Sequence, residues 1–360
     1  MKQEKIKRLT SKARFDRERL PIYPAQARGR TIPLFKTLLR SDCQNDCKFC
    51  VNRYSRQCHR YSMEPEEFAN AAMKLHERGK IQGVFLSSAL SHDPEFDSKR
   101  EVEAIKMLRE NGYTDYVHLR LMPGCSLDTI KQAAKVADRL GINLEAPNSE
   151  IYNELKVSDV FDYKTGVLKR MKWISRIFRN IDRSKPWGGV RAGIDTQFIV
   201  GATQDHDRDY LQVTEELYQK FGLQRVYYSG FEPVPRTPLG DHPPCSRERV
   251  YRLYQASFLL RDYGFAHDDL IYEEEGNLLA EDPKMAFAEA HEELFPVEIN
   301  SAPYERLLLV PGIGPVTARK ILKKRPITSL TELETIRGRG LKKMLKFIEL
   351  PCLTLRNFIS

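Results

Sequence analysis

The chain has 360 residues, of which 41% are apolar, and this composition describes a globular protein with room for one large and one small domain. It contains no apolar run near the ~20 residues that a membrane-spanning helix requires. Its first residues, Met-Lys-Gln-Glu-Lys, are not followed by an apolar signal segment. We therefore expect a cytoplasmic protein without a membrane partner.

The formal net charge of +9 is concentrated at the two ends of the chain. Residues 1–30 have a balance of +7 and residues 301–360 a balance of +8, so the span between them has a balance of −6. Basic ends that flank a mildly acidic body are typical of a protein that binds a polyanion, although solvated charged termini give the same balance.

The first 31 residues form a basic extension that we expect to be irregular, because Pro21 and Pro24 prevent a long helix. Beyond it, strands and helices alternate, which predicts a parallel sheet with right-handed crossovers. Functional residues of such a fold follow the carboxyl ends of the strands. The expected strands are 32–41, 83–88, 115–121, 142–146, 190–200 and 224–231, and the expected helices are 64–78, 98–111, 126–140, 164–181, 205–221 and 246–262.

Three cysteines, Cys43, Cys47 and Cys50, follow the first expected strand with the spacing C-x3-C-x2-C. Three soft thiolates on one short loop converge on one metal centre, and three ligands where four are usual leave an exchangeable position. A disulfide is disfavoured, because the chain is long, has seven cysteines and lacks a secretory signal.

Zinc is the alternative for this region, with Cys47, Cys50, Cys58 and His59 as ligands, although the paired spacing typical of zinc is only loosely met. The other cysteines are scattered, and we expect them to be small buried apolar residues. They are Cys58, Cys125, Cys245 and Cys352.

The cysteine spacing, with the aromatic Phe49 before the third cysteine, resembles the signature of the radical S-adenosylmethionine (radical-SAM) enzymes. The resemblance implies an α/β fold, a partial (β/α)6 barrel over residues 32–264. It also implies that the three thiolates hold three irons of a [4Fe-4S] cluster, with S-adenosylmethionine on the fourth. An electron from a reducing donor would then cleave this cofactor to a 5′-deoxyadenosyl radical.

Residues after other strand ends resemble cofactor-binding positions of the same family. Ser87 and Ser88 stand where the family commonly has a Gly-Gly-Glu-like stretch, so the role of its glutamate is in doubt here, and a plain small-residue turn is the alternative. Gly201 and Phe231 close the last two strands, near the expected adenine pocket.

Glu145 and Asn148 follow the fourth expected strand and correspond to contacts with the ribose or the methionyl group. A carboxylate at the end of an interior strand is costly to bury unless it accepts hydrogen bonds, and a ribose diol is a suitable pair of donors. For Asn148, capping of a helix is the alternative.

Residues 265–300 form an acidic bridge with one expected helix near 283–291, and residues 301–360 follow as a small all-α domain. The stretch 309–321 resembles the helix-hairpin-helix motif of DNA repair and replication proteins, and its Gly-x-Gly arrangement recurs near residue 338. Such glycines permit a tight turn, and the amides of the next helix bind phosphate with little sequence preference. The expected contacts to nucleic acid are Gly312, Gly314, Thr317, Lys320, Gly338, Gly340 and Lys342.

The whole chain resembles a family of radical-SAM proteins assigned to DNA modification or repair. We expect an enzyme that acts on nucleic acid, with double-stranded DNA favoured, and that uses a reducing electron donor and a repair protein as partners. No residue is assigned to the hydrogen transfer itself. The alternatives are a DNA-binding iron-sulfur protein that senses redox state or recruits repair partners, a radical-SAM enzyme acting on RNA such as tRNA, and a C-terminal domain used for protein contacts.

Overall fold

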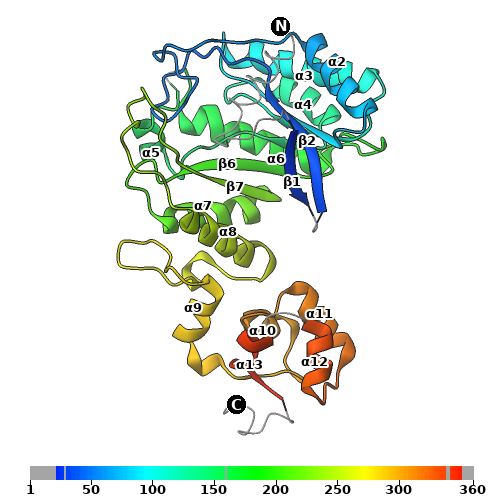
Figure 1. Ribbon diagram of the computed structural model, residues 1–360, viewed down its shortest axis with the longest axis vertical. Helices are drawn as coiled ribbons and strands as arrows, with labels where there is room; N and C mark the ends of the chain where they lie inside the picture. The colour runs from blue at the N-terminus through cyan, green and yellow to red at the C-terminus, as the bar shows by residue number, and fades with distance from the viewer. Residues whose placement is uncertain (1–21, 28–29, 159, 338–340, 351–360) are drawn as a thin grey trace. The chain divides into compact units, whose positions relative to one another are not determined.

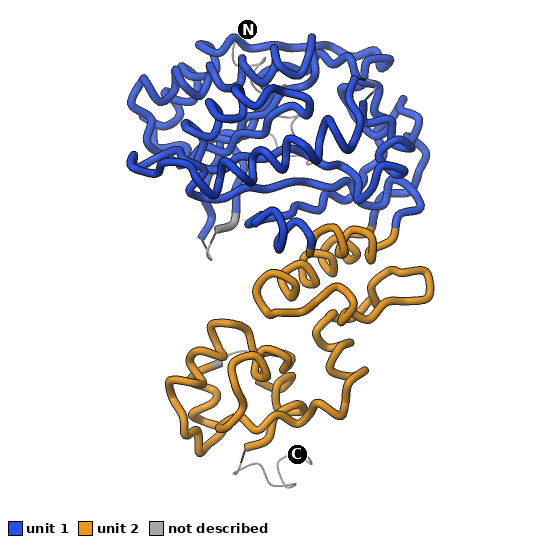
Figure 2. The backbone as a smooth tube through the Cα atoms, turned by 180° about the vertical axis from the view of Figure 1, so that it is seen from behind, with its two compact units in different colours: residues 1–205, 216–245 blue, residues 206–215, 246–360 orange. Residues whose placement is uncertain are grey.

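The computed structural model describes residues 22–27, 30–158, 160–337 and 341–350. The chain divides into two compact units (Figure 2). The first unit comprises residues 1–205 and 216–245, and the second comprises residues 206–215 and 246–360. This division places residues 246–264, which the sequence assigned to the barrel, in the second unit.

The first unit is built on one seven-stranded sheet whose strands lie side by side in chain order. Figure 1 labels β1 and β2 from one end of this order and β6 and β7 from the other. The first two strands form an antiparallel hairpin, and each later pair of neighbours is parallel. The predicted α/β half-barrel is therefore confirmed. Its strands are β1 (Ile22–Ala27), β2 (Arg30–Leu38), β3 (Gly83–Ser87), β4 (Tyr116–Arg120), β5 (Arg139–Gly141), β6 (Ile194–Val200) and β7 (Arg225–Gly230).

Helices follow the strands, and their starts are marked by residues that accept from free amides. Asp93 accepts from Glu95 N and Phe96 N, and the Ser126 hydroxyl accepts from Thr129 N. The predicted helix 164–181 begins as a π-helical turn. The helices of this unit are α2 (Pro65–Glu77), α3 (Pro94–Glu110), α4 (Leu127–Val136), α5 (Ser149–Glu154), η1 (Tyr163–Leu168), α6 (Lys169–Asn180) and η2 (Leu217–Phe221).

Two expectations about the strands are wrong. Residues 22–27 were expected to be irregular but pair with β2, and Pro24 is tolerated because β1 is an edge strand, where a missing N–H is harmless. The fourth parallel strand is β5 rather than 142–146, where only Glu145 makes an isolated bridge to Phe198. Residues 1–21 of the basic extension lie outside the described residues.

The second unit contains α7 (Asp207–Glu216), α8 (Arg247–Asp262) and a series of short helices around one apolar core. Leu307, Ile321, Leu333 and Met344 are among the fully buried residues of this core. The expected helix near 283–291 is confirmed as α9. The remaining elements are η3 (His267–Asp269), α9 (Pro283–Ala290), η4 (Glu292–Leu294), β8 (Val297–Glu298), α10 (Tyr304–Leu309), α11 (Pro315–Lys324), α12 (Leu330–Arg337), α13 (Leu341–Leu345) and β9 (Ile348–Glu349).

The strands β8 and β9 pair in parallel, so the C-terminal region is not all-α as expected. Its helices follow one another as two pairs, α10 with α11 and α12 with α13. Gly338 and Gly340 of the second expected hairpin, and Cys352, lie outside the described residues. Across the described chain, no helix has both the length and the apolar character needed to span a membrane.

Candidate cofactor and substrate site

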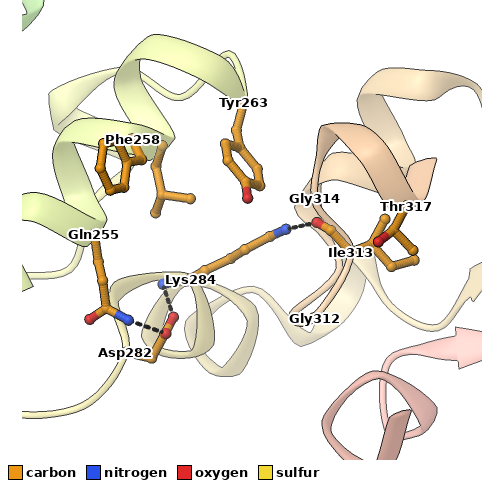
Figure 3. A pocket seen from close by; sticks show the side chains of 10 residues that line it. Gln255, Phe258, Tyr263, Asp282, Lys284, Gly312, Ile313, Gly314 and Thr317 are labelled. Atoms are coloured by element: carbon orange, nitrogen blue, oxygen red, sulfur yellow. Dashed lines mark hydrogen bonds between the residues drawn. The ribbon is translucent and has the colours of Figure 1, made fainter. Parts of the chain in front are cut away.

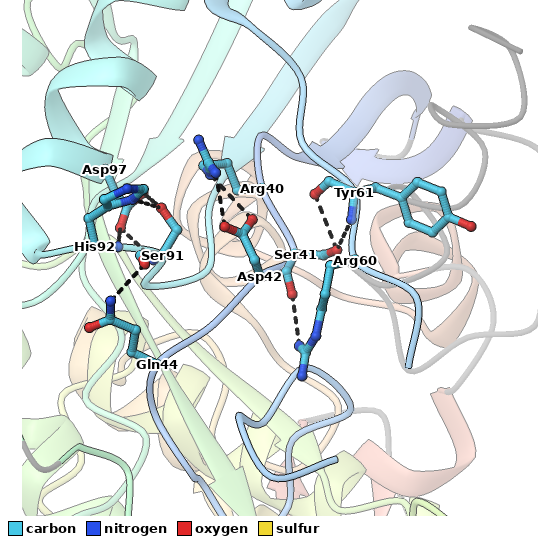
Figure 4. Close-up of polar contacts among 9 residues, drawn as sticks. All are labelled: Arg40, Ser41, Asp42, Gln44, Arg60, Tyr61, Ser91, His92 and Asp97. Atoms are coloured by element: carbon cyan, nitrogen blue, oxygen red, sulfur yellow. Dashed lines mark hydrogen bonds and ion pairs between the residues drawn. The ribbon is translucent and has the colours of Figure 1, made fainter. Parts of the chain in front are cut away.

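The loop after β2 carries the three cysteines and is tied to the turn that follows β3 (Figure 4). The backbone nitrogen of Gln44 donates to Leu90 O at 2.7 Å, and its side-chain Nε2 donates to Ser91 O at 2.9 Å. Ser91 in turn donates through Oγ to Asp97 Oδ1 at 2.5 Å. These bonds fix the first half of the loop against the sheet.

Arg60 fixes the second half of the loop. Its guanidinium donates to the backbone carbonyls of Ser41, Asn52 and Arg53 at 3.0, 2.5 and 2.7 Å. The Arg53 guanidinium donates to Asp46 Oδ1 at 2.9 Å and holds the pKa of the Asp46 carboxyl well below its usual range. A segment without regular secondary structure thereby satisfies its carbonyls and keeps one shape.

The thiols of Cys43, Cys47 and Cys50 lie close enough to affect one another's titration. Burial raises the pKa of Cys47 well above its usual range, and the other two thiols raise it further. Burial also raises the pKa of Cys50 to about 12. Cys47 Sγ donates to Val157 O at 3.1 Å, and Asn52 N donates to Cys50 Sγ at 3.4 Å. Thiols in this environment become thiolates when a metal centre takes the place of their protons.

A [4Fe-4S] cluster and a single zinc ion place different demands on these thiols. Zinc draws its ligand atoms to within about 2.3 Å of one point, whereas the thiolates of a [4Fe-4S] cluster bind different irons and are spread more widely. Among the described residues, no three Cys, His, Asp or Glu side chains are placed to hold one metal ion. Cys58, a ligand in the zinc alternative, has its Sγ 3.8 Å from Val51 O.

Glu145 faces the same region from the segment after β5. Its Oε1 accepts from Asn143 Nδ2 at 2.7 Å, whereas its buried Oε2 has no hydrogen-bond partner within the described part of the chain. Burial raises the pKa of Glu145 to about 7, and its charge raises the pKa of both Cys47 and Cys50. A buried acceptor without a partner calls for a donor from outside the chain, and a ribose hydroxyl or the ammonium group of S-adenosylmethionine fits that need.

Three of the other expected cofactor residues have partners within the protein. Asn148 caps α5, because its Oδ1 accepts from Ile151 N at 2.9 Å, which is the alternative that the sequence left open. The Ser87 hydroxyl donates to Arg120 O at 3.1 Å, and Gly201 N donates to the Asp205 carboxylate.

Ser88 and the two aromatic candidates are buried. Ser88 Oγ has no partner among the residues described, and it stands beside the cysteine loop because the next residue, Ala89, donates its backbone N–H to Arg40 O at 3.1 Å. Phe49 and Phe231 are 6% and 1% exposed. Phe231 packs edge-on against His242, with ring centres 5.4 Å apart.

The inner face of the sheet carries polar residues that the sequence reading missed. Strands of a parallel sheet that is covered on both faces are apolar throughout. Here β4 alternates, with Val117 and Leu119 fully buried on one face and Tyr116, His118 and Arg120 on the other. The alternation was visible in the sequence as Tyr-Val-His-Leu-Arg. The other strands add Lys36, Phe85, Arg139, Asp195, Gln197, Arg225 and Tyr227 to this face.

Asp195 is the centre of this inner layer. Its carboxylate lies 2.7 Å from Arg120 Nη2 and 2.7 Å from His118 Nε2. Burial lowers the pKa of His118 to about 4, so the guanidinium groups of Arg120 and, to a smaller extent, Arg139 keep Asp195 ionised at neutral pH. The Arg120 guanidinium also lies 5.6 and 5.5 Å from the ring centres of Phe85 and Tyr227.

Comparisons with known proteins agree with this geometry. Residues 41–217 match the model of the radical SAM superfamily. They form a radical-SAM domain. Proteins of this superfamily bind a [4Fe-4S] cluster and S-adenosylmethionine and draw on an electron donor, so the two cofactors expected from the sequence are confirmed.

Individual relatives are distant. An uncharacterized protein of Methanocaldococcus jannaschii is 21% identical over 191 residues, which cover 52% of this chain and 44% of that protein. The chain thus spans less than half of the curated relative that it matches. The crystal structure of HydG, a maturase of the [FeFe]-hydrogenase, has a TM-score of 0.50 at 17% identity, covering 63% of this chain and 49% of that chain. Methylornithine synthase (PylB) has a TM-score of 0.49 at 17% identity, with 64% and 62% covered. The likeness to HydG concerns the fold.

Proposed function

We propose that the protein is a radical-SAM enzyme that acts on nucleic acid, with double-stranded DNA favoured, in modification or repair. Cys43, Cys47 and Cys50 would hold the [4Fe-4S] cluster, and Glu145 would accept hydrogen bonds from S-adenosylmethionine. When bound, these two groups supply a radical that removes a hydrogen atom from the substrate. The observation that carries the proposal is the fixed three-cysteine loop of a radical-SAM domain, facing a buried carboxylate oxygen that lacks a donor.

The inner face of the sheet supports a nucleotide as the substrate. Within the described residues, this face presents the cations Lys36, Arg120, Arg139 and Arg225 against the carboxylates of Asp195 and Glu145. Four cations against two carboxylates leave this face with a net positive charge, which favours an anionic ligand. The aromatic rings on the same face can stack on a planar base. A nucleotide offers both a phosphate and a base.

The second unit supports a nucleic-acid partner through its basic surface. Arg319, Lys320, Lys323 and Lys324 of α11 are all exposed. The turn before α11 has Gly312 at φ +89°, a conformation that favours glycine. Helix N-termini of this kind bind phosphate, and nearby lysines add charge. The tandem helix-hairpin-helix assignment, the repair partner and the cytoplasmic location remain parts of this proposal.

Anaerobic incubation with S-adenosylmethionine and a reductant tests the enzyme. We expect 5′-deoxyadenosine to form, and to form faster with duplex DNA than with tRNA or without nucleic acid. Mass spectrometry of nucleosides from cells with and without the protein would then identify the altered base or sugar. Stimulation by tRNA instead would establish the RNA alternative. DNA binding that depends on the cluster but yields no 5′-deoxyadenosine would establish the redox sensor.

A further inference from the structure

A cavity of about 350 Å³ lies within the second unit, where the end of α8, the start of α9 and the turn before α11 meet (Figure 3). Phe258 lines it from α8, Tyr263 from the residue that follows α8, Lys284 from α9, and Gly314 and Thr317 from the turn and α11. A second hollow of about 370 Å³ shares Gln255 and Asp282 with the first and extends along α8 to Tyr251. Because the two hollows share these lining residues, we treat them together and name them the α8–α9 groove.

Hydrogen bonds give the walls of the α8–α9 groove a fixed shape. Asp282 accepts through Oδ2 from Gln255 Nε2 at 2.6 Å and through Oδ1 from Lys284 N at 3.0 Å. The Lys284 side chain is only 6% exposed, and its Nζ donates to Ile313 O at 2.6 Å. The same Nζ lies 4.6 Å from the centre of the Tyr263 ring. The groove is therefore formed before any ligand enters it.

Its side chains match the parts of an unpaired nucleotide strand. Tyr251, which is 59% exposed, and Phe258 stand two helical turns apart on α8, so their rings face the same groove. The exposed ring of Tyr251 can stack on the face of a base, whereas Phe258 is only partly exposed and has the Arg261 guanidinium 5.1 Å from its ring centre. The carboxylates of Glu281 and Asp282 would repel a phosphate inside the groove, but they can accept from the amino groups of base edges. Lys343, at the rim, is an exposed cation for the backbone outside.

We propose that the α8–α9 groove binds the bases of an unpaired strand of nucleic acid beside the first hairpin. The inference rests on the proposed function, because it takes a nucleic acid as the partner of this unit. It adds a specific preference: a duplex that carries a single-stranded tail or an unpaired base should bind more tightly than a blunt duplex. Neither the hairpin nor the radical-SAM domain predicts this preference by itself.

The test compares the affinity of the full-length protein for a blunt duplex and for the same duplex with a short single-stranded tail. We expect the tail to strengthen binding about tenfold, which corresponds to stacking of one base. Tyr251→Ala should abolish this gain, and Tyr251→Phe, which keeps the ring, should retain it. Phe96→Ala is the matched control, since Phe96 is an exposed aromatic residue on α3 of the other unit. The fluorescence of 2-aminopurine in the tail should be quenched by the wild type and the Phe variant only.

The outcomes separate this proposal from the proposed function. Equal affinity for blunt and tailed duplexes, or a gain that survives in Tyr251→Ala, would overturn the groove as a base site and leave duplex binding intact. Failure of the wild type to bind either duplex would overturn the nucleic-acid partner itself, and the groove proposal with it. The assay needs no bound cluster, so loss of cofactor chemistry cannot imitate either result.

Discussion

Glu145 occupies a backbone conformation that residues with a side chain seldom adopt, with φ at +62°. Such a conformation costs about 1–2 kcal/mol in a residue other than glycine and persists where the surroundings impose it. Here the backbone is held on both sides, because Glu145 N donates to Gln197 O at 2.9 Å and Ile199 N donates to Glu145 O at 2.8 Å. The strained residue is also the one with an unpartnered buried carboxylate oxygen, which favours a functional origin of the strain.

Glu145→Gln tests this role. The amide keeps the shape of the side chain but removes the negative charge, and a hydrogen bond to a charged group is worth about 1.5–3 kcal/mol. We expect iron content and folding to stay at wild-type levels, while the dissociation constant for S-adenosylmethionine rises about tenfold. Isothermal titration under anaerobic conditions measures it. Glu154→Gln, at an exposed position on α5, is the control, and equal affinities in both variants would remove Glu145 from the cofactor site.

The ligand assignment predicts different results for two cysteines of the same segment. Cys47→Ala should lose the cluster and all cleavage of S-adenosylmethionine, because each of the three thiolates is expected to hold one iron and the variant keeps only two of them. Cys58→Ala should keep its iron, since Cys58 is half-buried and its Sγ lies near Val51 O. Iron analysis and the visible absorption of the reconstituted proteins measure both. Iron loss in Cys58→Ala would show that the ligands are assigned wrongly.

His118 gives the first unit a dependence of stability on pH. Burial lowers the pKa of His118 to about 4, below the ordinary value of about 6.5, so folding keeps the imidazole neutral. The unfolded chain binds a proton more readily between these values, and acid therefore favours unfolding. The His118 contribution is present above pH 6.5 and should fall by about 2 kcal/mol on going to pH 4.5.

Urea unfolding of the first unit at these two pH values measures the loss. His118→Gln should remove most of the His118 contribution, because its amide does not titrate. His92→Gln should behave as the wild type, since His92 is exposed on the turn after β3. An unchanged difference between the two pH values in His118→Gln would mean that other groups carry the acid sensitivity.

At the scale of elements, the turn before α11 is packed more closely than the hairpin motif alone requires. Gly314 has an ordinary φ of −108°, but a Cβ added to it would lie 2.9 Å from the hydroxyl of Tyr263. The residue is therefore small because Tyr263 of the same unit approaches it. The contact of Gly314 with phosphate is part of the proposed function.

A double-mutant cycle tests this contact. Gly314→Ala should destabilise the second unit by about 1 kcal/mol, since overpacking forces neighbours to move. Tyr263→Phe removes the hydroxyl. In the double variant it should relieve most of the cost of Gly314→Ala, so that the double variant is more stable than the sum of the two single effects predicts. Thermal unfolding of the four proteins supplies the numbers. Additive effects would show that the added methyl group meets something other than the Tyr263 hydroxyl.

The elements that the sequence predicted well are those with strong local signals. Pro65 at the start of α2 and the apolar face of α3 locate these helices, although α3 begins at Pro94, four residues before the predicted start. The fourth parallel strand was displaced because apolar residues continue past β5 into 142–146, whereas the backbone leaves the ladder to reach Glu145. The polar inner layer around Asp195 was not predicted, because the alternation of strands and helices locates each strand but does not tell which of its residues face the inside of the sheet.

At the scale of the whole molecule, the basic C-terminal region and the cofactor chemistry belong to different units of the chain. Residues 301–360 carry a balance of +8, whereas the cysteine loop and Glu145 lie in the first unit. Substitutions on the basic surface should therefore change nucleic-acid affinity and leave cleavage of S-adenosylmethionine without nucleic acid unchanged. The two properties can then be measured independently on the same protein.

The last prediction uses the dependence of binding on salt. Affinity falls as salt rises, and each phosphate that a lysine neutralises makes the slope of log affinity against log salt concentration steeper by about 0.9. Lys320→Ala should weaken binding to unrelated duplexes to a similar extent and lower the slope by about one contact, because phosphate carries no sequence information. Lys131→Ala, at an exposed position on α4 of the first unit, is the matched control and should leave the slope unchanged. If Lys320→Ala and Lys323→Ala both keep the wild-type affinity and slope, α11 does not bind phosphate, and its basic surface serves a protein partner instead.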